Sequence, residues 1–95
     1  MSEDVTTLRV RVEGNVQGVG FRAFAVRQAL ALNLKGWVRN RTDGALEALV
    51  SGTVKDVERF VQACMRWPEG AKVKNIDLFS ETDPGSQGFI ELPTA

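Results

Sequence analysis

The segment Gly14-Asn-Val-Gln-Gly-Val-Gly-Phe-Arg22 places three glycines within seven residues and an arginine two residues later. A helix is expected to begin at its end, and Gly18, Val19 and Gly20 offer no side chain that could cap it. Open N–H groups at a helix N-terminus, with an arginine in the first turn, suit a phosphate or a carboxylate. A tight turn whose N–H groups bond to water would use the same glycines, so glycine spacing alone leaves both interpretations open.

The composition limits the chemistry. The 95 residues include no histidine and one cysteine, which excludes histidine bases, most metal sites and any intramolecular disulfide. Cys64 falls on the apolar stripe of a predicted helix, which favours a core position over a nucleophile. No Gly-Lys-Ser/Thr follows the glycine segment and a third fingerprint glycine is missing, so it is neither a Walker loop nor a dinucleotide motif.

The charges are balanced overall, with twelve Lys and Arg against twelve Asp and Glu, which argues against a uniformly basic nucleic-acid binder. Residues 5–41 nevertheless carry seven positive residues and one negative, so we expect the first half to bind any anionic ligand. Arg39 and Arg41 are expected to be solvated charges beside that site. The chain has no apolar run of the roughly 20 residues needed to cross a bilayer, and we expect a cytoplasmic protein without membrane or nucleic-acid partners.

The hydropathy pattern predicts a β-α-β-β-α-β order with a short terminal strand. Strands are expected at residues 8–12, 35–41, 45–50, 73–79 and 89–92, with helices near 21–32 and 54–66. Asp43-Gly44 predicts a tight hairpin turn, Thr53 a helix cap, and Trp67-Pro68 with Gly70 the end of the second helix. One domain over residues 1–95 follows, with about residues 1–5 flexible, and this element order suits an antiparallel sheet that carries both helices on one face.

Two spaced motifs make the resemblance specific: the glycine segment through Arg22, and Gly36-Trp-Val-Arg-Asn40-Arg-Thr-Asp43-Gly44. In this order, and with this length and element order, they resemble the paired signatures of the acylphosphatase family. The resemblance implies an α+β ferredoxin-like sandwich with the sheet order 4-1-3-2. It also implies a hydrolase that cleaves the carboxyl-phosphate bond of acyl phosphates without a cofactor. Asn33, where the family more often has glycine, and the Phe-Ile-Glu-Leu ending depart from the pattern outside these motifs.

The resemblance also assigns roles to single residues. Arg22 would bind the phosphate and Asn40 would orient the attacking water. The phosphate loop would comprise Gly14, Asn15, Val16, Gln17, Gly18, Val19, Gly20 and Phe21. The implied ligands are a small acyl phosphate and its product, inorganic phosphate, bound to a protein that we expect to be a monomer.

The chemistry supports this assignment independently. The first two strands of a split β-α-β unit are parallel. Asn40, near the end of the second strand, therefore emerges at the same sheet edge as the loop that follows Glu13. The carboxylate of an acyl phosphate leaves readily, so a protein without histidine can catalyse its hydrolysis by positioning and charge. We expect no metal, because Glu13 is the loop's one carboxylate and Mg²⁺ sites usually take one or two.

Two other functional classes use similar features. An RNA-recognition module would place aromatic residues on its central strands, and residues 8–12 and 45–50 contain none. A non-catalytic domain that binds a small anion for regulation would use the same loop and Arg22, and Asn40 alone argues for turnover. Trp37 and Trp67 are expected to be packing residues. Asp43 could act as a general base, but its position before glycine in a tight turn is a sufficient structural reason for an aspartate there.

Overall fold

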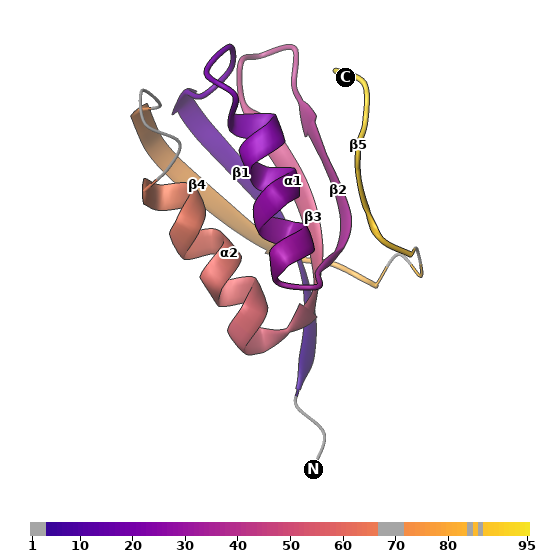
Figure 1. Cartoon of the computed structure of the whole chain (residues 1–95). Helices are drawn as coiled ribbons and strands as arrows, with labels where there is room; N and C mark the ends of the chain where they lie inside the picture. Colours follow the sequence, from indigo (N-terminus) through magenta and orange to yellow (C-terminus); the bar gives the residue numbers. More distant parts are fainter. Residues whose placement is uncertain (1–3, 67–71, 84, 86) are drawn as a thin grey trace.

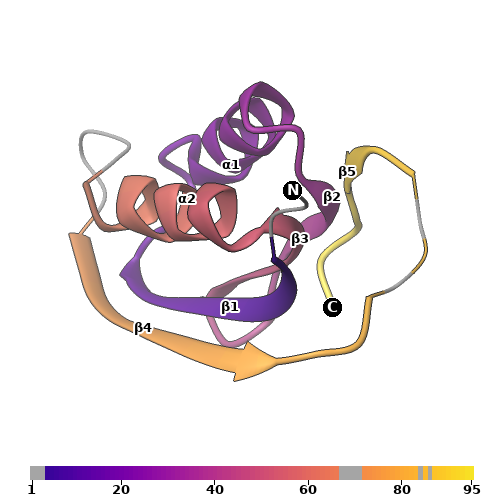
Figure 2. The same ribbon diagram turned by 90° about the horizontal axis from the view of Figure 1, so that it is seen from below.

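The computed structural model describes residues 4–66, 72–83, 85 and 87–95. Its elements are β1 (Val5–Asn15), α1 (Phe21–Ala31), β2 (Lys35–Asn40), β3 (Leu46–Thr53), α2 (Val54–Arg66), β4 (Lys72–Ser80) and β5 (Phe89–Glu91). Both helices cover the same face of one sheet, which confirms the predicted ferredoxin-like sandwich (Figures 1 and 2). No helix in this part of the chain is long and apolar enough to cross a membrane.

The sheet has the order β4-β1-β3-β2-β5, which contains the expected order of the first four strands. β3 is antiparallel to both β1 and β2, so β1 and β2 are parallel, as predicted. The predicted antiparallel pairing holds among the first four strands, and the five-stranded sheet is mixed because the terminal strand β5 pairs with β2 in parallel. The connection after β4 carries the chain to the opposite edge of the sheet, and β5 then runs in the direction of β2 (Figure 2).

The core lies between the sheet and the helices. Alternate residues of β1, Val10 and Val12, are fully buried against the apolar stripe of α2. Phe89 of β5 also faces inward, where its ring lies 6.3 Å from that of Phe60, which settles the side on which the last strand packs. Cys64 is buried as predicted, and desolvation raises the pKa of its thiol to about 12.

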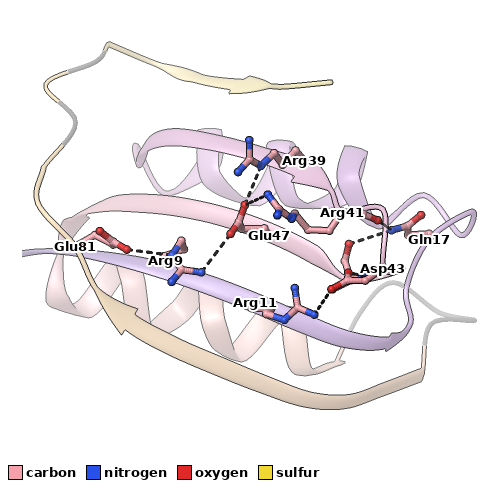
Figure 3. A network of polar contacts seen from close by, with 9 residues as sticks. Arg9, Arg11, Gln17, Arg39, Arg41, Asp43, Glu47 and Glu81 are labelled. Atoms are coloured by element: carbon pink, nitrogen blue, oxygen red, sulfur yellow. Dashed lines mark hydrogen bonds and ion pairs between the residues drawn. The ribbon is translucent and has the colours of Figure 1, made fainter. Parts of the chain in front are cut away.

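The sheet face without helices is covered by ion pairs (Figure 3). Glu47 of the central strand is 6% exposed and contacts the guanidinium groups of Arg9, Arg39 and Arg41 at 3.2, 2.8 and 3.4 Å. The expectation that Arg39 and Arg41 are solvated charges is therefore wrong. Their side chains shield a carboxylate that would otherwise lie in the middle of an open sheet face. Trp37 packs there as well, under the guanidinium of Arg39 at 4.8 Å.

Local signals place the ends of the elements. The Thr53 hydroxyl accepts the backbone N–H of Asp56 at 3.2 Å, which caps α2. Asn33 takes the positive φ of 56° that follows α1. The register of β4 shifts opposite Glu13 and Gly14, which explains why Val73 is out of phase with the rest of its strand. The predicted stop signals for α2, Trp67-Pro68 and Gly70, lie outside the described residues, although α2 ends at Arg66 as expected.

The N-terminal segment predicted to be flexible, about residues 1–5, is described only from Asp4 onward. The carbonyl of Asp4 accepts the backbone N–H of Val54 at 3.1 Å. Val5 is the first residue of β1 and pairs with Thr53. Val5 therefore joins the sheet, and Asp4 bonds to the first residue of α2, at the point where β3 meets that helix.

Candidate active site

The start of α1 and the end of β2 meet at one end of the sheet, as the parallel arrangement of β1 and β2 requires (Figure 1). A cavity of about 190 Å³ lies there. Its described lining comprises Val16, Gln17, Gly18, Gly20, Phe21, Arg22, Ala23, Asn40 and Glu91. The fold thus brings Arg22 and Asn40 to one cavity, together with most of the predicted loop.

The glycines of this loop are needed for backbone conformation. Gly18 and Gly20 have φ angles of 77° and 79°, in the left-handed region that other residues rarely adopt. A Cβ at either position would meet no atom within 4 Å, so lack of space is not the reason for glycine. Gly20 is the N-cap of α1 and the helix has no side-chain cap, as the sequence predicted. The first N–H groups of α1 are therefore left to other acceptors.

Three predicted loop residues lie outside the cavity lining. Gly14 and Asn15 are the last residues of β1 and pair with β4. Gly14 has a φ of 132°, and a Cβ on it would collide with the carbonyl of Lys72, so the close approach of β4 accounts for this glycine. Val19 packs against the edge of the hydrophobic core.

The other loop residues face the cavity in different ways. The side chains of Val16 and Phe21 are each 1% exposed and belong to the core, so their contribution to a ligand is limited to the backbone. The amide of Gln17 donates hydrogen bonds to the carbonyls of Arg41 and Ala45 at 2.8 and 3.0 Å (Figure 3). Gln17 thereby ties the loop to the hairpin that follows Asn40.

Arg22 and Asn40 approach the cavity from different elements. Arg22, in the first turn of α1, is 38% exposed at its side chain, and its Nε lies 3.4 Å from Oε1 of Glu91. Asn40 ends β2, pairs with Leu46 of β3, and accepts the backbone N–H of Ala95 at its carbonyl at 3.1 Å. The backbone of Asn40 is thus held on both sides, which fixes the origin of its side chain.

Glu91 and Ala23 line the cavity although the sequence did not point to them. The alternation of Phe89, Ile90 and Glu91 could have placed Glu91 on the inward side, once Phe89 was known to face the core. The sequence alone did not give the inward face of this strand, because its partner lies about fifty residues away.

Asp43, the alternative general base, has a structural role. Its Oδ1 accepts the backbone N–H of Ala45 at 3.0 Å, and its Oδ2 accepts a hydrogen bond from Arg11 at 2.6 Å. These two contacts, the backbone one first, hold the pKa of Asp43 below its usual range, which makes it a poor proton acceptor. In the described parts of the chain, no group of three acidic or cysteine side chains is placed to hold a metal ion.

Comparison with known proteins shows the family to which the chain belongs. The family model described as Acylphosphatase matches residues 8–90. The chain belongs to the acylphosphatase family. It is 47% identical over 88 residues to an acylphosphatase of Rhizorhabdus wittichii, covering 90% of this chain and 87% of that protein. The crystal structure of acylphosphatase from Bacillus subtilis superposes with a TM-score of 0.88 and 34% identity, covering 94% of this chain and 99% of the other.

Family membership confirms the activity expected from the two motifs. The protein is a hydrolase of acyl phosphates, small substrates whose carboxyl-phosphate bond it cleaves. The alternative of a non-catalytic domain that only binds an anion has no support. A structure of an acylphosphatase from Coxiella burnetii extends the likeness, with a TM-score of 0.89, 28% identity and 94% coverage of both chains.

Proposed function

We propose that the acylphosphatase binds the phosphoryl group of its substrate in the 190 Å³ cavity, with Arg22 and the loop backbone as ligands and Asn40 as the residue that orients water. The observation that carries this proposal is that residues 18 positions apart in the sequence, on α1 and β2, line one cavity at the uncapped end of a helix. The phosphate loop is residues 14–21, of which Val16, Gln17, Gly18, Gly20 and Phe21 line the cavity.

Charge would provide most of the binding energy. The N–H groups at the start of α1 carry the positive end of the helix dipole, and no side chain caps them. The Arg22 guanidinium adds a planar pair of donors that fits two phosphoryl oxygens at once. The helix N–H groups and the guanidinium both stabilise the transition state more than the ground state, because negative charge spreads over the phosphoryl oxygens there.

The remaining requirement is a positioned nucleophile. The side-chain amide of Asn40 can donate to one oxygen and accept from another, so it can hold a water in line with the phosphorus atom. The carboxylate product is a good leaving group and needs no proton from the protein, which suits a chain without histidine. Reaction by this route needs neither a metal ion nor a cofactor.

The finer setting of the reaction is part of the same proposal. We propose that the protein acts as a monomer, as expected from its sequence. A single buried cysteine suits a reducing compartment, and on that ground we place the protein in the cytoplasm. We also propose that residues 1–95 form one domain.

The test is release of inorganic phosphate from a simple acyl phosphate such as acetyl or benzoyl phosphate. We expect equal rates in excess chelator and in millimolar Mg²⁺, because no step uses the metal. The control is the uncatalysed hydrolysis of the same substrate in each buffer, since Mg²⁺ itself alters that background. A tenfold or greater loss of enzymatic rate in chelator, reversed by adding Mg²⁺, would contradict metal-independent catalysis.

A further inference from the structure

Glu91 puts a negative charge at a cavity that is proposed to bind an anion. It is the one acidic side chain among the described residues that line this cavity. A carboxylate there opposes phosphate binding by simple repulsion, so its presence needs a physical reason.

The contact that Glu91 makes suggests that reason. Its Oε1 lies 3.4 Å from Nε of Arg22, the guanidinium nitrogen nearest to the main chain. An arginine contacted through Nε still has two terminal nitrogens for a bidentate bond to another anion. A carboxylate on Nε and a phosphoryl group on the terminal nitrogens can therefore share one guanidinium.

Stability does not explain the pair. The side chains of Arg22 and Glu91 are 38% and 49% exposed, and ion pairs this open to solvent contribute little to folding. An unrestrained arginine of the same exposure would sample many rotamers, and ordering it on substrate binding would cost entropy. Restraint of Arg22 before the substrate arrives removes part of that cost.

The strand that carries Glu91 is well fixed. Glu91 pairs with Val38 of β2, two residues before Asn40. On one side of it Phe89 is buried in the core, and on the other the N–H of Leu92 donates to the carbonyl of Val38 at 2.8 Å. Glu91 therefore links the position of Arg22 on α1 to the strand that carries Asn40.

We propose that Glu91 is a positioning residue that holds the Arg22 guanidinium through Nε in the orientation that receives the phosphoryl group. The inference rests on the proposed function, since it gives Glu91 no role apart from Arg22. It places the third determinant of the site on β5, outside both sequence motifs.

A purely structural role makes different predictions. Glu91 lies beside the first turn of α1, where a carboxylate also stabilises the helix dipole. That role would lower the melting temperature of a variant and leave its turnover unchanged at temperatures where it is fully folded. It would also act equally whether or not residue 22 is arginine.

The experiment is the kinetics of Glu91→Gln, which removes the charge and keeps the shape. We expect kcat to fall about tenfold, below the roughly 100-fold that a misplacement of about 1 Å can cost. The inhibition constant of inorganic phosphate should stay within about threefold, because losing a repelling charge offsets a less ordered arginine. Glu91→Asp keeps the charge on a shorter side chain and should retain more activity than Glu91→Gln.

Glu81→Gln is the matched control. Glu81 is 40% exposed at its side chain and contacts Nε of Arg9 at 3.0 Å, at the opposite end of the drawn residues from Gln17, which lines the cavity (Figure 3). The Glu81→Gln variant loses the same kind of ion pair, between a carboxylate and an arginine Nε, and should keep wild-type kcat.

A double-mutant cycle with Arg22→Ala decides the route of the effect. If Glu91 acts through Arg22, adding Glu91→Gln to Arg22→Ala should change kcat less than twofold. An equal tenfold loss in both backgrounds, or wild-type kcat in folded Glu91→Gln, would overturn the inference. Failure of the proposed site is a separate result, since it would appear as near-normal activity in Arg22→Ala itself.

Discussion

Arg22 and Asn40 line the same cavity, and their proposed roles predict different kinetic defects. Arg22→Ala should lower kcat/KM by at least ~10²- to 10³-fold, the typical effect of losing one transition-state donor, and should weaken inhibition by phosphate. Arg22→Lys should restore activity only in part, because a point charge lacks the planar fork. Asn40→Ala should lower kcat similarly and leave the phosphate inhibition constant nearly unchanged, because a water-orienting contact is made mainly in the transition state.

Steady-state kinetics with phosphate as a competitive inhibitor distinguishes the two variants. Circular dichroism and thermal melts must accompany the kinetics, since Asn40 shares β2 with the fully buried Val38. If folded Asn40→Ala lost phosphate affinity in proportion to its activity, Asn40 would be a phosphate ligand and its proposed role in orienting water would be wrong.

At the scale of elements, the site depends on the loop before α1 staying attached to the hairpin between β2 and β3. Gln17 makes this attachment with two hydrogen bonds to backbone carbonyls. Gln17→Ala should lower the free energy of unfolding by about 1–2 kcal/mol, at roughly 1 kcal/mol for each bond. Gln17→Glu should be worse than Gln17→Ala, because a carboxylate cannot donate and would repel both carbonyls.

Urea denaturation measures these differences, with Gln62→Ala on the exposed side of α2 as a control that should change the free energy of unfolding little. A Gln17→Glu protein as stable as wild type would show that the loop does not depend on these bonds.

At the scale of the whole molecule, a sheet with helices on one face must protect its other face in some other way. Here Glu47 on the central strand contacts arginines of β1, of β2 and of the residue that follows β2, and these cover that face. Glu47→Gln should lower the free energy of unfolding by about 1–3 kcal/mol, less than the loss of a fully buried pair because the arginines remain partly exposed. Glu81→Gln, at the exposed edge of the same network, should cost less than about 1 kcal/mol.

Denaturant unfolding at low ionic strength is the measurement for this pair of variants. Equal losses for Glu47→Gln and Glu81→Gln would mean that burial of Glu47 does not strengthen its contacts with the arginines.

Much of the protein was determined by the sequence alone, because the signals are local. Alternation in β1, the Asp43-Gly44 turn, the Thr53 cap and the positive φ at Asn33 depend on neighbouring residues, and each was predicted where the structure has it. The glycines before Arg22 also predicted that α1 begins without a side-chain cap, because capping depends on the residues next to the helix start. Parallel β1 and β2 then required that Arg22 and Asn40 lie at one sheet edge.

Tertiary structure alone decided the contacts between distant segments. The parallel pairing of β5 with β2 depends on where the chain goes after β4, and no local pattern fixes that path. The approach of Glu91 to Arg22 follows from this pairing, as does the position of Phe89 in the core. Glu47 likewise forms its ion pairs with Arg9 and Arg39 because β1, β3 and β2 lie side by side. Such ion pairs depend on strand register, which sequence neighbours do not encode.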